Sequence, residues 1–323
     1  MLTTVLDTDD LPPADRTAAW EEATARALLT TSHKFPDPEN FGARLHTVTL
    51  GPAQLSDVSY TSLVSQRTPR LIRRSDPEFY QVALATVGQQ GMEYAGHRTA
   101  VGAGDIVLYD SSRPFTATAG PAGSTSHCLL LQFPRSLMPL PDKVVAPLCG
   151  TTLDGARGTG LVFRRTLTGL IDAHDRIGPG DRVRLGHTAV DLAAAVIAQH
   201  AERSALLPPE TRQQALFQEA TRFITLRPGD PDLKPAAIAA AHFVSTRYLH
   251  RVFQRNGTTV NGFIRQARIS RCRRDLADPS LHAAPVAAIG ARWGFTRPSD
   301  FTRAFRAATG MTPGEYRAAA RGS

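Results

Sequence analysis

One arrangement of two short helices is written twice in the last part of the chain, and this repeat constrains the fold more than any other feature. The copies read IAAAHFVSTRYLHRVF from Ile238 and IGARWGFTRPSDFTRAF from Ile289. In each copy a short apolar helix should end at a turn, at Val244 and at Gly294, before a second helix with apolar residues at i, i+3 and i+4. The first helices match at an offset of 51 residues and the second helices at 52. The two turns should therefore differ by one residue.

The second helix of each copy should bury one face and expose the opposite one. Its expected core residues are Leu249, Val252, Phe253, Phe301, Ala304 and Phe305. The opposite face carries Arg247, His250, Arg251, Ser299, Thr302 and Arg303. A helix of this kind lays its polar face in the major groove of DNA, where arginine suits guanine and Ser, Thr and His read donors or acceptors. These six residues are predicted base contacts, and Ser245 and Arg297, at the helix starts, are predicted phosphate contacts.

From about Pro235 to Arg317 the chain resembles the paired helix-turn-helix domain of the AraC/XylS transcription regulators. The residues that carry the resemblance are Ser245, Leu249, Phe253, Gly257, Arg268, Ala288, Gly294, Phe295, Phe301, Arg303, Phe305, Gly310, Met311, Thr312, Pro313, Tyr316 and Arg317. Arg297 departs from the pattern, because the family usually has a small polar cap just before Pro298. The resemblance implies a regulator that binds double-stranded DNA, with RNA polymerase as a candidate partner.

The positive charge of the chain is concentrated in the same region. The formal net charge is +8, yet residues 206–323 hold 18 Lys and Arg against 8 Asp and Glu, a net charge of +10. Between Ser245 and Arg274 there are eight arginines and no acidic residue. The alternative is a solvated helix face without a ligand in an arginine-rich protein. This alternative explains why Arg is used in place of Lys, but not why Asp and Glu are absent from the segment. The composition therefore favours a surface that neutralises phosphates.

Two further helices are predicted around the repeat. One, about Arg212 to Leu226, should brace the first copy. The other, roughly Val260 to Ala277, should connect the copies and end at Asp278-Pro279. At about 1.5 Å per residue the connecting helix spans ~27 Å, close to the ~34 Å between successive major-groove faces on one side of a duplex. The two recognition helices of one chain could therefore enter adjacent turns of DNA.

The first half of the chain has the pattern of short antiparallel strands. An amphipathic helix is predicted over residues 15–30. Short apolar or alternating runs follow it at residues 43–50, 55–64, 78–87, 91–94, 105–109 and 127–133, separated by Gly, Pro, Asp and Ser. The segment GHRTAVGAGDIVLYDSSRPFTATAG, from Gly96, resembles the turn and strand of a cupin-type barrel, the sensor fold commonly joined to this DNA-binding domain.

Such a barrel could hold a metal or a small molecule. A cupin metal site needs two closely spaced His, a carboxylate and a third His on a later strand, whereas His97 and His127 each stand without a neighbouring His. We therefore expect no metal, no cofactor and no catalytic residues. The expected ligand is a small-molecule effector inside the barrel. Candidate ligand-binding residues are Tyr80, Tyr94, His97, Tyr109 and His127, and the alternative is that these residues only pack.

Helical periodicity returns from Gly160 onward and ends at the proline-bearing linker LLPPETRQQ. In the second of these helices an apolar stripe recurs at Leu185, Ala189, Leu192 and Val196. The stripe either packs on its own barrel or pairs two subunits. Helices at this position pair subunits in the resembled family, so we expect a homodimer.

The predicted fold class is α+β with two domains: an N-terminal cupin-like antiparallel β-barrel with flanking helices, and a C-terminal all-α domain with two helix-turn-helix motifs. We expect residues 1–175 to form the sensor, residues 176–210 the helical dimerisation element and linker, and residues 211–323 the DNA-binding domain. The three cysteines lack ligand spacing, and there is no leader pattern and no run of 18 apolar residues, which indicates a cytoplasmic protein.

The function predicted from these patterns is a sequence-specific DNA-binding transcription regulator that responds to a small-molecule effector. Three alternatives stay open. The first is a regulator whose N-terminal domain only oligomerises. The second is a barrel enzyme with a DNA-binding tail, and the third an alkyl-transfer repair protein with a reactive cysteine. Neither enzyme is supported by the ligand or cysteine spacing.

Overall fold

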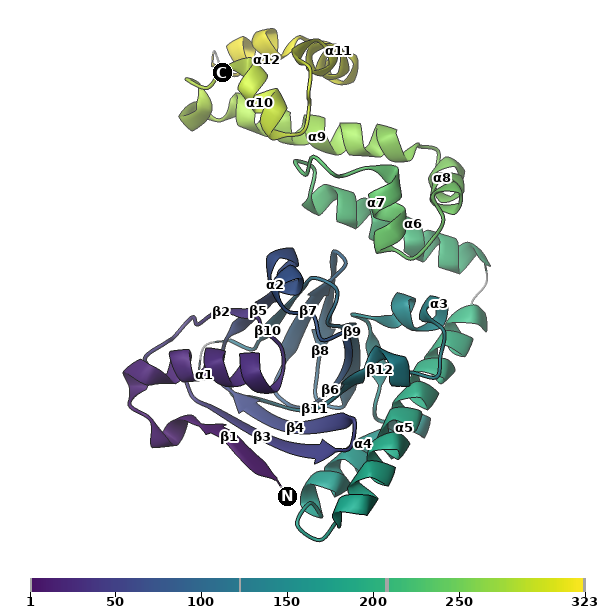
Figure 1. Ribbon diagram of the computed structural model, residues 1–323. Helices are drawn as coiled ribbons and strands as arrows, with labels where there is room; N and C mark the ends of the chain where they lie inside the picture. The colour runs from purple at the N-terminus through teal and green to yellow at the C-terminus, as the bar shows by residue number, and fades with distance from the viewer. Residues whose placement is uncertain (1, 122, 207–208, 322–323) are drawn as a thin grey trace. The chain divides into compact units, whose positions relative to one another are not determined.

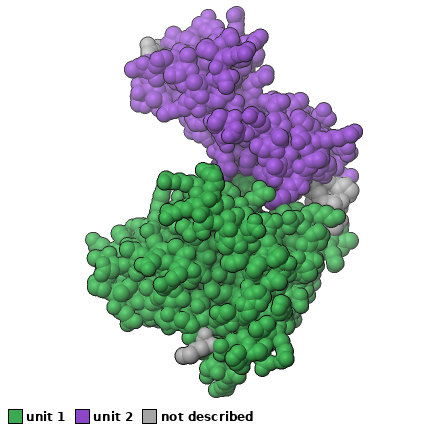
Figure 2. Space-filling model, viewed as in Figure 1, with its two compact units in different colours: residues 1–206 green, residues 207–323 purple. Residues whose placement is uncertain are grey.

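The computed structural model describes residues 2–121, 123–206 and 209–321. The chain divides into two compact units, residues 1–206 and residues 207–323, coloured separately in Figure 2. We call them the barrel unit and the helical unit, and each is described by itself. The division falls between Leu206 and Leu207, within the stretch 176–210 that the sequence suggests as a separate element. No helix of the described chain is long and apolar enough to cross a membrane.

The barrel unit is built from two antiparallel sheets (Figure 1). The larger sheet has the order β1-β3-β4-β11-β6-β9-β12, with strands Thr3–Asp7, Ala43–Leu50, Ala53–Tyr60, Ser126–Pro134, Phe79–Val87, Asp105–Asp110 and Thr152–Asp154. The smaller has the order β2-β5-β10-β7-β8, with strands Ser32–Lys34, Val64–Arg67, Phe115–Ala119, Gln90–Tyr94 and His97–Val101. The predicted cupin-like barrel is thereby confirmed.

Strand β11 lies at the centre of the larger sheet, between β4 and β6. Cys128 and Leu130 point to the barrel interior, while Leu129 and Leu131 point to the opposite face, and all four are buried. Because both faces of β11 are covered, its sequence reads as an apolar run instead of an alternation. The run predicted as one strand over residues 55–64 is wrong in this respect: it contains the end of β4 and the start of β5, which belong to different sheets.

The barrel unit also contains helices. They are α1 Pro13–Ala27, α2 Pro69–Arg74, α3 Asp142–Val145, α4 Gly158–Asp172 and α5 Pro179–Leu206, with short 3-10 turns at residues 8–10, 135–137 and 146–148. Helix α5 packs against α4 and strands β3 and β4 (Figure 1). A Cβ at Gly186 would lie 2.1 Å from the Leu50 carbonyl oxygen, so glycine permits this close approach of helix to sheet.

The apolar stripe predicted on this helix is used within the barrel unit. Ala189 and Val196 are buried in the barrel core, and Leu185 and Leu192 pack against it partly buried. This packing agrees with the alternative in which the stripe packs on its own barrel. Pairing of two subunits through α5 stays a prediction.

The helical unit contains α6 Pro209–Leu226, α7 Pro235–Ala241, α8 Thr246–Arg255, α9 Val260–Ala277, α10 Val286–Arg292, α11 Pro298–Thr309 and α12 Pro313–Arg321, with a 3-10 turn at residues 279–281. Helix α9 has the bounds that the sequence predicts. It runs between the two helix-turn-helix motifs in Figure 1 and contributes to both of their cores. Val260 and Ile264 pack in the first core, whereas Ile269, Cys272 and Leu276 pack in the second.

The turns of the two motifs differ by one residue, as the sequence offsets require. The first turn runs from His242 to the N-cap Ser245, and the second from Trp293 to the N-cap Arg297. Each turn has its second residue in the left-handed region, with φ of 53° at Phe243 and 82° at Gly294. The glycine adopts this conformation without strain, while the phenylalanine does so at a cost of about 1–2 kcal/mol.

Candidate DNA-binding face and barrel cavity

Helix α8 is the recognition helix of the first motif. Its start is fixed by Ser245, whose hydroxyl oxygen accepts a hydrogen bond of 3.2 Å from the backbone N–H of Tyr248. Leu249, Val252 and Phe253 are fully buried, as predicted. The opposite side of the helix is thereby turned to solvent.

The residues of α8 that are predicted to contact DNA bases lie on this solvent-facing side. Arg247 and Arg251 are exposed and His250 is half-buried. Within the described residues none of the three makes a hydrogen bond or an ion pair with another side chain or with backbone. Their donors are free to contact a ligand outside the chain.

Helix α11 is the recognition helix of the second motif. The polar side chains on its exposed face make more contacts within the chain than those of α8 do. Phe301 and Phe305 are buried. Ser299, Thr302 and Arg303 are exposed, as predicted. The hydroxyl of Thr302 donates to the Pro298 carbonyl at 3.0 Å, and Nη2 of Arg303 lies 2.5 Å from Oδ1 of Asp300.

The start of α11 also departs from that of α8. Arg297 occupies the N-cap position with extended backbone, and its side chain makes no capping hydrogen bond. The exposed guanidinium is available to an external group at the helix N-terminus, where phosphates bind readily.

Two further residues, which were not predicted from the sequence, lie on the polar faces of α8 and α11. Gln254 and Arg306 are exposed and follow Arg247 and Ser299 at i+7, one helical repeat further on. The i+7 spacing is the sequence signal that could have identified them. The faces of both helices therefore extend over two turns.

Arg268 on α9 braces the two motifs against each other. Its guanidinium donates to three backbone carbonyls: Nε to Pro228 at 2.9 Å, Nη1 to Gly294 at 2.8 Å and Nη2 to Asp230 at 3.1 Å. Burial lowers the pKa of Arg268, but an arginine of this kind stays charged. One side chain thus joins the loop after α6 to the turn of the second motif.

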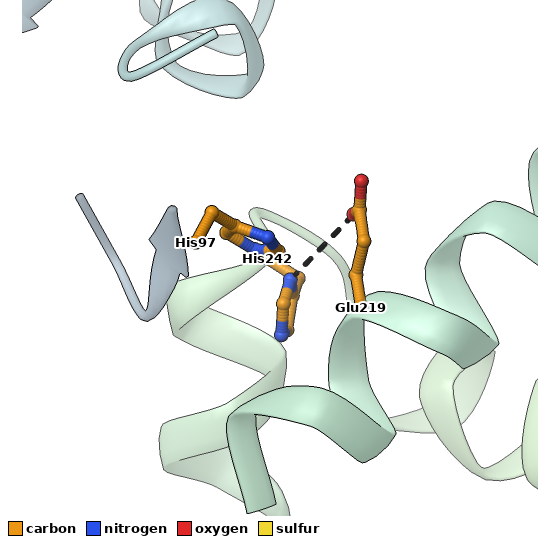
Figure 3. A group of neighbouring side chains, drawn as sticks. All are labelled: His97, Glu219 and His242. Carbon is orange, nitrogen blue, oxygen red and sulfur yellow. Dashed lines mark ion pairs between the residues drawn. The ribbon is translucent and has the colours of Figure 1, made fainter. Parts of the chain in front are cut away.

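An ion pair between a buried histidine and a half-exposed glutamate joins α6 to the end of α7 (Figure 3). Nδ1 of His242, at the end of α7, lies 4.0 Å from Oε2 of Glu219 on α6, and burial raises the pKa of Glu219. The His242 ring also packs edge-on against Phe223. His97, drawn in the same figure, belongs to strand β8 of the barrel unit.

A partly open cavity of about 120 Å³ lies between the two sheets and helix α1 of the barrel unit. The larger sheet contributes Val58, Tyr60, Gln81, Ala83, Ala85, Val107, Tyr109, Cys128 and Leu130. The smaller sheet and the segment before it contribute Thr31, His33, Leu63, Ser65, Gln90, Gly91, Met92, Val101, Phe115, Ala117, Thr118 and Ala119. Helix α1 and the residues after it add Trp20, Thr24, Leu28 and Leu29.

Of the five predicted ligand-binding residues, Tyr109 lines this cavity and the other four lie elsewhere. The hydroxyl of Tyr80 donates to Asp142 at 3.3 Å. Tyr94 packs over Gly150. His97 begins β8 opposite Tyr94, just after the turn between β7 and β8. Their role in ligand binding stays a prediction, and the cavity geometry favours Tyr109.

His127 is held by neighbours on the strands beside β11. Its Nε2 lies 2.5 Å from Oδ1 of Asp57, and its Nδ1 is hydrogen-bonded to the Thr86 hydroxyl. Asp57 lies on β4 and Thr86 on β6, the two strands that flank β11 in the larger sheet. His127 therefore has hydrogen-bonding partners on both ring nitrogens within its own sheet.

The polar groups that do line the cavity were missed by the sequence reasoning. Tyr60 donates from its hydroxyl to Oε1 of Gln90 at 3.3 Å. Nε1 of Trp20 and Nε2 of Gln90 are buried and have no hydrogen-bond partner among the described residues. Burial lowers the pKa of His33 to about 4, so its ring is neutral near pH 7. No local pattern marks these residues, because the cavity assembles from both sheets and a helix.

The three cysteines are buried in three different places and form no disulfide. Burial raises the pKa of the thiols of Cys128, Cys149 and Cys272 to about 12. Thiolate is therefore scarce at neutral pH, and the geometry gives none of them the activation that a nucleophilic cysteine needs.

Comparisons with known proteins cover both units. Residues 20–198 match the AraC-binding-like domain family, and residues 238–319 match a helix-turn-helix domain family. The chain is 27% identical to the transcriptional activator NphR of Rhodococcus sp. over 97% of this chain and 92% of that protein. It is 36% identical to the ornithine utilization regulator of Pseudomonas aeruginosa over 36% of this chain and 33% of that protein.

A solved structure has a similar fold over most of the chain. The crystal structure of the AraC-like transcriptional activator CuxR superposes with a TM-score of 0.52 at 20% identity, covering 90% of this chain and 98% of that one. At this identity the likeness shows a similar fold and nothing further.

Proposed function

Because the chain belongs to the AraC-like family of transcription regulators, it is a DNA-binding regulator of transcription, and we propose which of its side chains read DNA and what its barrel unit does. The observation that carries the proposal is the repeated recognition face. Residues 247, 250, 251 and 254 of α8 recur at an offset of 52 as residues 299, 302, 303 and 306 of α11. In both helices this face lies opposite a buried phenylalanine pair or Leu/Phe pair.

The length of the helix that connects the two faces suits binding along one side of a duplex. Helix α9 has 18 residues and is about 27 Å long at 1.5 Å per residue. Successive major-groove faces lie ~34 Å apart. One chain would therefore place α8 and α11 in adjacent major-groove turns.

The two helices are proposed to divide the work of reading DNA. Arg247 and Arg251 have no partner in the described chain and supply planar forks for guanine O6 and N7. Arg303 is held by Asp300, so its base contact must compete with an ion pair. The first helix is thus the main reader, and Ser245 and Arg297 contact phosphates at the helix starts.

The test is selection of DNA sites by the full chain followed by a binding series at several salt concentrations. We expect an enriched sequence with two motifs about one helical turn apart, and affinity that falls steeply with salt because arginines release counterions. Arg251→Ala should cost about 1–3 kcal/mol on the selected site and little on scrambled DNA. Equal losses on both DNAs would place Arg251 on the backbone, and salt-independent binding would refute the proposed face.

The barrel unit is proposed to bind a small-molecule effector. The support is its cavity, which is lined by buried polar groups as well as apolar ones. The relative NphR is named a transcriptional activator, so we propose activation, with RNA polymerase as a partner. A homodimer held through the barrel unit completes the proposal. Sedimentation of the full chain tests dimer formation, and an all-monomer result over the concentrations that bind operator would refute it.

A further inference from the structure

We propose that the effector is a small uncharged molecule with an apolar body and one hydrogen-bond acceptor, which takes the N–H groups of Trp20 and Gln90 inside the barrel. This inference rests on the proposed effector role of the cavity and goes beyond it, because it states the chemical class of the ligand. Three independent features of the cavity carry it: its size, the charge of its lining and its two unmatched donors.

The size of the cavity limits the ligand to about one ring. The cavity measures about 120 Å³, whereas an engineered apolar cavity of roughly 150 Å³ holds benzene. Its walls are mainly apolar, including Met92, Val107, Phe115 and Leu130. A small aromatic or branched aliphatic body would therefore fill it, and a sugar or a long acyl chain would not.

The lining favours an uncharged ligand. It contains no Asp, Glu, Lys or Arg side chain that could pair with an ion. The titratable groups that face it are the imidazole of His33, the thiol of Cys128 and the phenols of Tyr60 and Tyr109. Burial keeps each of these groups neutral near pH 7. An ionised ligand would lose its hydration without gaining a counter-charge.

Two buried donors supply the polar contact. Trp20 is only 3% exposed, and its Nε1–H has no acceptor within the described chain. The Gln90 amide is oriented by Tyr60, which donates to Oε1 and leaves Nε2 without a partner. A tryptophan N–H can only donate. In the proposed complex, an acceptor atom of the ligand, such as a carbonyl oxygen, accepts hydrogen bonds from these N–H groups.

The experiment uses three compounds of matched size on the full chain. Acetophenone has an acceptor, α-methylstyrene replaces its oxygen by a methylene group, and benzoate carries a charge. Binding is measured by calorimetry and by Trp20 fluorescence in a Trp293→Phe background, since the chain has two tryptophans. We expect acetophenone to bind roughly tenfold more tightly than α-methylstyrene, about the value of one hydrogen bond, and benzoate not to bind.

Two variants test whether the preference for acetophenone over α-methylstyrene arises from the cavity. Gln90→Leu keeps the size of the side chain and removes its donor, so it should reduce the preference for acetophenone over α-methylstyrene. Gln89→Leu is the matched control, because Gln89 is the exposed neighbour in the chain and does not line the cavity. The control should keep the full preference.

The outcomes separate this inference from the proposed function. Equal affinity for acetophenone and α-methylstyrene would refute the proposed hydrogen bond to an acceptor of the ligand. Tight binding of benzoate would refute the proposal that the ligand is uncharged. No binding of any of the three would mean that water occupies the donors, and the ligand class would be wrong. Binding of the same protein to its selected DNA site is measured in parallel, so a loss of DNA binding would count against the proposed function alone.

Discussion

Replacing Arg268 by alanine should loosen the two helix-turn-helix motifs from each other. The guanidinium makes three hydrogen bonds of 2.8 to 3.1 Å to carbonyls of Pro228, Asp230 and Gly294. Hydrogen bonds from a charged donor contribute about 1.5–3 kcal/mol each, and partial exposure of Arg268 reduces this sum. We therefore expect Arg268→Ala to lower the free energy of unfolding of the helical unit by about 3 kcal/mol.

The assay is urea unfolding of the full chain followed by the fluorescence of Trp293. A Trp20→Phe background makes Trp293 the single reporter, and it lies in the helical unit beside Gly294. For a unit of about this size the slope is roughly 1.5 kcal/mol per molar urea, so the midpoint should fall by about 2 M. Arg268→Lys should recover only part of the loss, because an ammonium lacks the planar fork that reaches three carbonyls.

The matched control is Arg265→Ala, one turn earlier on the same helix. Arg265 is exposed and has no hydrogen bond or ion pair with another described residue. Its loss should change the free energy of unfolding by less than about 0.5 kcal/mol. If Arg268→Ala cost no more than Arg265→Ala, the bracing role of Arg268 would be refuted.

Three further predictions follow from particular contacts. Asp300→Asn should release the Arg303 guanidinium and tighten binding to the selected DNA by roughly two- to fivefold, measured by titration of fluorescent duplex; unchanged or weaker binding would contradict this. Gly294→Ala should destabilise the helical unit by at least about 1 kcal/mol in urea unfolding, because alanine is strained at its φ of 82° and its Cβ would lie 2.6 Å from Cζ of Arg268. The third prediction concerns pH. Burial in the folded barrel lowers the pKa of His33 to about 4, whereas its value in the unfolded chain is 6.5. Between pH 4 and pH 6.5 the unfolded chain therefore binds more protons than the folded chain. Stability of the barrel unit should be full above pH 6.5 and fall by about 3 kcal/mol towards pH 4, and His33→Gln should flatten this slope; an equal slope in that variant would exclude His33 as its source.

The sequence predicted the helical unit better than the barrel, for physical reasons. The bounds of α9 follow from local signals: Thr259 caps its N-terminus and Asp278-Pro279 ends it. The core positions of α8 and α11 follow from helical periodicity, which local packing preserves. The contact that joins the motifs, from Arg268 to three carbonyls, depends on loops distant in sequence and could not be derived from spacing.

In the barrel, strands with long apolar runs were predicted and short polar strands were missed. Strand β8, HRTAV, and strand β10, FTATA, are five residues each and have few large apolar side chains. The cavity residues were missed for another reason. Trp20 reads as an ordinary core residue of an amphipathic helix, and nothing near Gln90 indicates that its amide is buried. Only the meeting of α1 with both sheets brings them together.

Helix α9 sets a fixed phase between the two recognition helices. Since residues at its two ends are built into different cores, the helix cannot shorten, extend or rotate without breaking one of them. One base pair added between the two half-sites would turn the second groove by roughly 35° and shift it by ~3.4 Å. Within the described helical unit the two motifs are connected by the unbroken helix α9, so operator spacing should vary little among target genes. If the recognition helices are separated by about the ~27 Å length of α9, which is shorter than the ~34 Å groove repeat, the duplex should bend towards the protein. Flexible base steps would then have an advantage at positions that no side chain touches.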